Sequence, residues 1–181
     1  MSVELQQVKH RIGATRQIRK VTSAMQRVAA ARLINDRRTM ECSHEYTRRL
    51  REGIDQLMAA APGAEHPLLV PHASRPDAAV LVFGSDRGLC GAFHSALMDQ
   101  LDDFTASHRQ GNVTIMAIGK VIGRRCRRAA YWLRRTVMQP ARERRGSVLD
   151  ALTTEMIDLF LRGEVAEVFV LYSRFVTALN Q

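Results

Sequence analysis

Residues 78–94 have the sequence AAVLVFGSDRGLCGAFH, and this stretch decides the class of the fold. Its first six residues are an apolar run that ends before Gly84, which is typical of a strand buried on both faces. The glycine-rich turn 84–91 follows, and apolar residues at helical spacing begin at Phe93. A buried strand that leads through a tight turn into a helix is the first unit of an α/β domain.

The same alternation continues towards the C-terminal side. We expect further buried strands at 113–118 and 165–172, an edge strand at 131–137, and helices at 91–108, 119–130 and 147–161. Strands joined by helical crossovers predict a small Rossmann-like α/β domain with a mainly parallel sheet covered on both faces. We place this domain at 78–181, after a linker at 61–77 that contains Pro and Gly.

Residues 1–60 have a different pattern, which predicts one long amphipathic helix. Proline is absent between residue 3 and about residue 60. Polar residues 43–49 interrupt the apolar stripe and leave open a break in the helix there. The stripe consists of Leu5, Val8, Ile12, Ile18, Val21, Met25, Val28 or Ala29, and Leu33, and it resumes at Leu50, Ile54 and Leu57.

This stripe requires a partner. A helix of this length reaches about 80 Å, whereas a domain the size of 78–181 spans only about 26 Å. A helix with a long apolar face is held mainly by packing. We therefore expect it to meet another long helix, from this chain or from another one.

The composition excludes several classes of protein. Hydrophobic residues make up 46% of the chain, which argues against a disordered protein. The longest apolar run, 78–84, is far shorter than the roughly 18 residues of a membrane span. The first residues lack the apolar core of a secretory signal. Three distant cysteines and six scattered histidines fit neither a disulfide framework nor a metal site, and they suit a reducing compartment.

The charge is strongly basic, at +9, with 24 arginines and only 3 lysines. This excess predicts acidic partners without deciding between nucleic acid, membrane and protein. Nine arginines lie in 124–145, beside Tyr131 and Trp132 as candidate stacking groups, which would suit a nucleic-acid surface. We favour the alternative, a solvated or protein-facing basic surface.

The turn 84–91 lies where phosphate loops occur, between a strand and its helix. Its spacing matches neither G-x-G-x-x-G nor G-x-x-x-x-G-K-[ST]. We therefore favour a tight turn capped by Asp86 or Ser85. Cys90 has one local candidate base, His94, and we favour a structural thiol over a nucleophile. We expect no catalytic, cofactor-binding or metal-binding residue.

Two segments resemble the gamma subunit of F-type ATP synthases. Residues 15–33, TRQIRKVTSAMQRVAAARL, are similar to the family pattern NTxKITxAMxMVAAxKL, and residues 85–94, SDRGLCGAFH, are similar to SDRGLCGxxN. AIGK at 117–120 and LYSRFVTALNQ at 171–181 resemble further family segments. Departures from the family are Gln17 and Ile18 for Asn-Thr, Arg27 for methionine, and Val121 where glycine is common.

The resemblance implies a non-catalytic central rotor stalk. In the family the long N-terminal helix is half of an antiparallel coiled coil with a long C-terminal helix, inside the ring of alpha and beta subunits. The α/β domain lies at the foot, near the epsilon subunit and the membrane c-ring. Ion flow turns the shaft, and the shaft drives the beta subunits, which bind ATP and catalyse its synthesis, through their nucleotide states.

The resemblance also implies a peripheral position on the cytoplasmic face of a bacterial inner membrane. It implies no cofactor, no nucleic-acid partner and no direct small-molecule substrate. The implied coupling and partner-contact residues are Lys20, Thr22, Met25, Ala29, Arg32, Asp86, Arg87 and Cys90. Met25 matches the family methionine next to the acidic loop of beta, and Arg32 replaces the usual lysine.

Alternatives stay open because the family pattern continues beyond residue 181 to the C-terminal helix. The chain would then be a gamma subunit or an N-terminal fragment of one. It would otherwise be a truncated gamma-like subunit of an alternative or sodium-coupled F-type ATPase. A third alternative, from another class, is a basic α/β module that binds nucleotide or nucleic acid.

Overall fold

The computed structural model describes residues 3–63, 65–70 and 76–175. Three expectations extend beyond them. Residues 64 and 71–75 of the linker at 61–77, and residues 176–181 of the domain at 78–181, lie outside the described residues. The latter include most of the family segment at 171–181. The chain divides into two compact units, 1–64 and 65–181. Each unit is described by itself.

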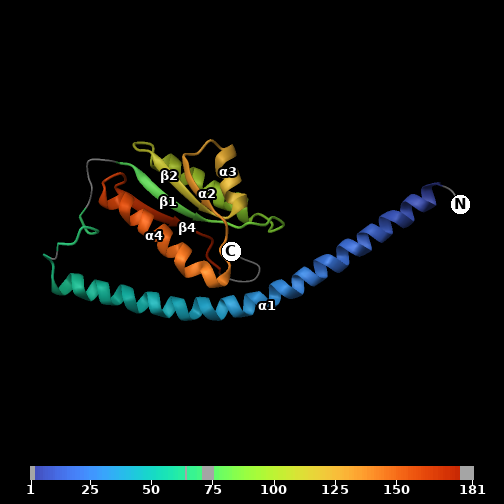
Figure 1. The fold of residues 1–181 in the computed structure, drawn as a ribbon, viewed down its shortest axis with the longest axis horizontal. Coiled ribbons are helices and arrows are strands. Elements are labelled where there is room, and N and C mark those ends of the chain that lie inside the picture. Colours follow the sequence, from blue (N-terminus) through green and yellow to red (C-terminus); the bar gives the residue numbers. More distant parts are fainter. Residues whose placement is uncertain (1–2, 64, 71–75, 176–181) are drawn as a thin grey trace. The chain divides into compact units, whose positions relative to one another are not determined.

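The first unit is one uninterrupted helix, α1 (Val3–Ala60), which runs the full length of the segment predicted to be helical (Figure 1). The break left open at 43–49 does not occur. Polar side chains in this segment and just before it form hydrogen bonds within the helix. The hydroxyls of Thr39, Ser43 and Thr47 each donate to the carbonyl oxygen four residues earlier, at 3.2, 2.9 and 2.8 Å.

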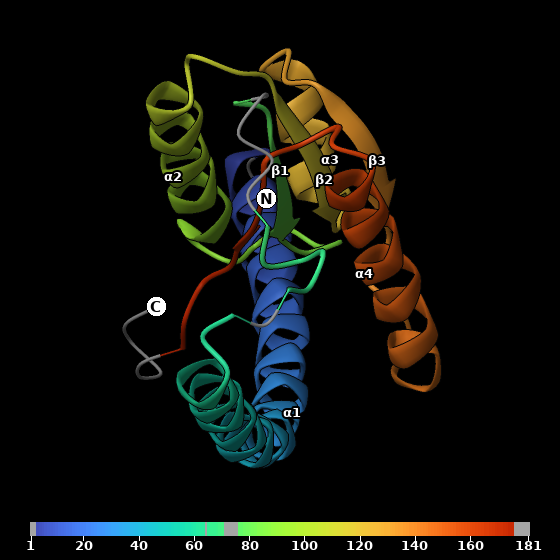
Figure 2. The same ribbon diagram turned by 90° about the vertical axis from the view of Figure 1, so that its left-hand side faces the viewer.

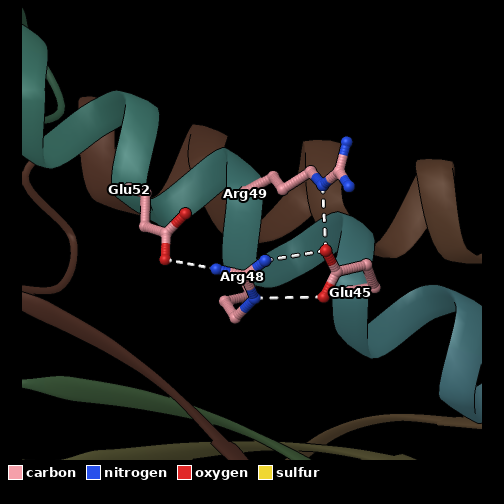
Figure 3. Close-up of polar contacts among 4 residues, drawn as sticks. All are labelled: Glu45, Arg48, Arg49 and Glu52. Carbon is pink, nitrogen blue, oxygen red and sulfur yellow. Dashed lines mark hydrogen bonds and ion pairs between the residues drawn. The ribbon is translucent and has the colours of Figure 1, made fainter.

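Ion pairs also support the helix across this polar segment (Figure 3). Glu45 accepts hydrogen bonds from Arg48 and Arg49, and Arg48 also pairs with Glu52. These hydrogen bonds, first from Arg48 and then from Arg49, lower the pKa of Glu45 to about 2. Pairs three and four residues apart favour helix even at exposed positions. The helix therefore continues where its apolar stripe is absent.

The second unit confirms the predicted α/β class. In the described part of the chain, four strands form one sheet in the order β3-β2-β1-β4, and every neighbouring pair is parallel. The strands are β1 (Ala78–Phe83), β2 (Val113–Ile118), β3 (Leu133–Val137) and β4 (Glu167–Leu171). The helices are α2 (Phe93–Ser107), α3 (Lys120–Arg128) and α4 (Arg145–Leu161), with a short 3-10 turn, η1 (Arg142–Arg144), before α4.

Helices cover both faces of this sheet, and Figure 2 shows its strands between α2 and α4. Successive strand residues point to opposite faces. Leu81 of β1 therefore packs with Met156 and other residues of α4. Val80 and Val82 pack on the other side, with residues of α2 and α3 such as Leu101.

The prediction of a buried strand at 165–172 was wrong in its burial. β4 lies at an edge of the sheet and pairs only with β1 among the described strands. Val168 and Val170 are 39% and 55% exposed. Their apolar composition resembled a central strand, but burial depends on the strand's place in the sheet.

In the described part of the chain, no helix is long and apolar enough to span a membrane.

The connection from β2 to α3 depends on Gly119. Its φ angle is +114°, a backbone conformation that residues other than glycine rarely adopt. A Cβ atom there would lie 2.6 Å from the backbone nitrogen of Ser85. Gly119 thus lets the chain pass close to the turn after β1.

We expect Gly119→Ala to lower the free energy of unfolding of the α/β unit by about 3 kcal/mol, through backbone strain and the clash with Ser85. The measurement is urea unfolding, in which the reactivity of the buried Cys126 thiol reports how much of the protein is unfolded. The matched control is Gly146→Ala, where a Cβ atom meets nothing within 4 Å. Equal unfolding midpoints for the two variants would contradict the role of Gly119.

Candidate functional site

The α1 surface contains four of the predicted contact residues on one face. Thr22, Met25, Ala29 and Arg32 recur at intervals of three and four residues, which places them side by side along the helix. Met25 is 49% exposed. The Thr22 hydroxyl donates to the carbonyl oxygen of Ile18 at 2.9 Å, so it is satisfied within the helix.

The apolar stripe of α1 is uncovered in the structure. Each large apolar side chain from Leu5 to Met58 is at least 39% exposed. The predicted need for a partner helix therefore remains. Among the described residues, no other helix approaches the 58 residues of α1, since the next longest, α4, has 17.

Lys20 lies away from the other predicted contact residues of α1. It precedes Met25 by five residues, which is about 140° around the helix. There it lines a shallow hollow whose other residues are Arg16, Arg19, Ser23, Ala24 and Arg27. No ion pair is formed by these cations within the described residues. The helix thus has a cationic face roughly opposite the face of Met25.

The second set of predicted residues lies in the turn after β1, and Asp86 holds that turn to the sheet. One carboxylate oxygen of Asp86 accepts a hydrogen bond from the backbone nitrogen of Lys120 at 2.8 Å. The other accepts from the backbone nitrogen of Gln139 at 3.0 Å. The Gln139 side chain in turn donates to the carbonyl oxygen of Gly84 at 3.2 Å.

These contacts correct the predicted capping. Asp86 caps the first residue of α3, whereas α2, which follows the turn, begins after Ala92 with no side-chain cap. The reason is that the ends of parallel strands meet at one edge of the sheet. The start of α3 is therefore occupied by a negatively charged group of the chain itself, the Asp86 carboxylate. Asp86 positions the turn, and both of its oxygens are engaged within the domain.

Of the predicted contact residues in this turn, Arg87 and Cys90 are exposed. Arg87 forms no ion pair within the described residues, and its carbonyl oxygen accepts from the Ser85 hydroxyl at 2.6 Å. The Cys90 sulfur lies 3.2 Å from Nδ1 of His94. The interpretation of Cys90 as a structural thiol stays a prediction. Cys90 is exposed, whereas Cys126 is buried.

His94 is the buried polar residue beneath the turn, at 3% exposed. Its Nε2 lies 3.0 Å from the Ser85 hydroxyl. Burial lowers the pKa of His94, the positive charge of Arg125 acts in the same direction, and a hydrogen bond with the backbone of Ser85 opposes them. Sequence alone identified His94 as a local base but not its contact with Ser85.

The arginine-rich stretch 124–145 is partly neutralised. Arg134 and Arg135 both bind Glu155, at 3.0 and 2.9 Å. Burial alone would raise the pKa of Glu155, but its hydrogen bonds with these two arginines outweigh burial and lower it. Of the two candidate stacking groups, Tyr131 donates its hydroxyl to Asp102, and Trp132 is 75% exposed. No group of three potential metal ligands occurs in the described ranges.

Comparison with known proteins gives a consistent result. The family model described as ATP synthase matches residues 4–181. The ATP synthase gamma chain of Syntrophobacter fumaroxidans is 31% identical over 98% of this chain and 62% of the relative. The gamma chains of Desulforapulum autotrophicum and Anaeromyxobacter dehalogenans are 30% and 32% identical, with 60% and 63% of their lengths covered. The chain therefore spans less than two thirds of these relatives.

We expect Asp86→Asn to lower the free energy of unfolding of the α/β unit by about 2 kcal/mol. An amide has one acceptor oxygen, so one of the two backbone N–H groups loses its partner. Urea unfolding, again followed by the reaction of Cys126, measures the change. The matched control is Asp99→Asn on α2, whose exposed carboxylate forms no hydrogen bond within the described residues. A loss no larger than that of the control would show that the Asp86 bridge contributes little.

Proposed function

The chain belongs to the gamma-chain family of ATP synthases, and from this premise we propose that it is the central rotor stalk of an F-type ATP synthase. In this role it couples transmembrane proton flow to ATP synthesis on the beta subunits by rotation. The chain itself is a non-catalytic subunit.

The observation that carries this proposal is the uncovered stripe of α1. Burying the exposed half of each large apolar side chain contributes about 1 kcal/mol. The stripe extends from Leu5 to Met58, so the total favours a permanent partner. A second long helix packed antiparallel along the stripe, within the ring of alpha and beta subunits, supplies that cover.

The unequal faces of α1 support the rotary part of the proposal. A shaft can drive the beta subunits through different states only if its sides differ. Met25 lies on a face with Thr22 and Ala29, whereas Lys20 lies in the cationic hollow on the far side, whose cations form no ion pair with any described residue. In the proposed assembly these cations meet acidic groups or backbone carbonyls of the surrounding subunits.

The α/β unit is the proposed foot of the stalk. In this assignment 1–60 is the coiled-coil helix, 61–77 the linker and 78–181 the foot domain. The foot meets the epsilon subunit and the membrane c-ring, which makes the chain a peripheral membrane protein on the cytoplasmic face of a bacterial inner membrane. Arg87 and Cys90 are the proposed contact residues of the turn, and Asp86 positions them through its two backbone hydrogen bonds.

Co-purification separates this proposal from the nucleic-acid alternative. We expect the tagged chain, co-expressed with alpha and beta subunits of its own organism, to be recovered with both. The purified chain alone should retain neither ATP nor DNA in a filter-binding assay. Binding of either one, lost on Arg124→Ala or Arg128→Ala, would instead support the basic-module alternative.

Met25→Lys tests the coupling role. A lysine there adds an ion pair of about 1 kcal/mol with an acidic loop of beta in one rotary position, which slows release from that position. We expect gradient-driven ATP synthesis in membrane vesicles to fall about fivefold, and ATP hydrolysis to fall less than about twofold.

The neighbouring substitution Gln26→Lys adds the same charge on a different side of the helix and serves as the matched control. We expect it to change both rates by less than about twofold. Equal losses of synthesis and hydrolysis in Met25→Lys would contradict the assigned coupling role.

A further inference from the structure

Three side chains at the turn after β1 form a connected group: Cys90, His94 and Ser85. The Cys90 sulfur lies 3.2 Å from Nδ1 of His94, and Nε2 of the same ring lies 3.0 Å from the Ser85 hydroxyl. We propose that Cys90 is a modification site that forms mixed disulfides with small disulfides such as glutathione disulfide, with His94 as its base and Ser85 orienting the ring. A thiol, a base and a group that orients the base are the arrangement that activates a nucleophile.

The hydrogen bonds determine which ring nitrogen of His94 carries the proton. The Ser85 hydroxyl donates to the carbonyl oxygen of Arg87 at 2.6 Å, so its own proton is engaged. Its oxygen can then only accept, and Nε2 of His94 must be the donor. In the neutral ring Nδ1 is therefore an unprotonated acceptor, and it faces the Cys90 sulfur.

The surroundings of His94 keep its Nδ1 atom unprotonated at neutral pH. The residue is 3% exposed, and burial is the main cause that lowers its pKa. The charged group that acts on it from a packed element is Arg125 of α3, which lowers the pKa further. The hydrogen bond to the backbone of Ser85 acts in the opposite direction and is the smallest of the three causes.

The sulfur is accessible although its base is not. Cys90 is exposed, and it lies between Leu89 and Gly91, which both have φ of +59°. Leu89, next to Cys90, is fully exposed. In the unassembled chain, a small disulfide can therefore reach Cys90 from solvent. The buried imidazole ring of His94 accepts the thiol proton.

The reaction is a thiol–disulfide exchange. The Cys90 sulfur attacks one sulfur of the small disulfide, and the thiol proton passes to Nδ1 of His94. The disulfide bond breaks, and its other half leaves as a thiolate that takes the proton back from His94. The products are a mixed disulfide on Cys90 and one free thiol, and an excess of thiol reverses the exchange.

The other two cysteines provide internal references. Cys42 is exposed on α1 and has no hydrogen bond within the described residues. Cys126 is buried, and burial raises the pKa of its thiol to about 11. The family pattern SDRGLCGxxN has asparagine where this chain has His94. Asparagine cannot accept the proton, so the proposed reactivity is a property of this chain and does not depend on the rotor assignment.

The test uses the 181-residue chain with glutathione disulfide at pH 7, and peptide mass spectrometry follows each cysteine. We expect Cys90 to react at least about tenfold faster than Cys42, because a positioned base contributes that much or more. We expect Cys126 to stay unmodified. His94→Asn should slow Cys90 at least about tenfold and leave Cys42 unchanged, whereas the control His108→Asn should alter neither.

The pH dependence of the unsubstituted chain decides the question without a variant. An unassisted thiol reacts through its thiolate, so its rate falls about tenfold for each pH unit below neutral. The rate of Cys90 should stay level through neutral pH and fall only when His94, whose pKa is lowered by burial, takes up a proton. This profile holds even if His94→Asn unfolds the domain, which the loss of Cys126 protection would reveal. Rates of Cys90 and Cys42 within about twofold, with the same pH slope, would overturn the proposal.

Discussion

Apolar surface that stays in water costs free energy, and the two units of this chain meet that constraint in different ways. In the α/β unit, α2 and α3 cover one face of the sheet and α4 covers the other, so Val80, Leu81 and Val82 are almost fully buried. Helix α1 carries a comparable apolar stripe with no such cover. Its need for a partner therefore underlies the proposed place of the chain in a larger assembly.

The polar groups obey a matching constraint at the carboxyl edge of the sheet. The segments that follow β2 and β3 present backbone N–H groups there, and Asp86 accepts hydrogen bonds from two of them, those of Lys120 and Gln139. That bridge holds the turn in which Arg87 and Cys90 are exposed. His94, beneath the turn, has both ring nitrogens engaged. One short segment thus combines a structural carboxylate with an accessible sulfur.

Sequence analysis recovered the long helix, the parallel α/β domain and the edge position of 131–137. It left open a break in α1 at 43–49, because ion pairs and hydroxyl hydrogen bonds take the place there of the apolar pattern. It also assigned β4 to the interior. Apolar composition does not distinguish an edge strand from a central one when the neighbours of the strand are unknown.

The sequence by itself determined the local properties: helical spacing in 1–60, the strand–turn–helix pattern at 78–94, and the family motifs at Thr22, Met25 and 85–94. These depend on residues near one another in the chain. Only the tertiary structure decided what Asp86 binds, because its partners lie 34 and 53 residues away. The same holds for His94, whose state depends on its burial and on Arg125 of α3. Such contacts depend on the order of the strands in the sheet, which the hydrophobic periodicity of the sequence does not predict.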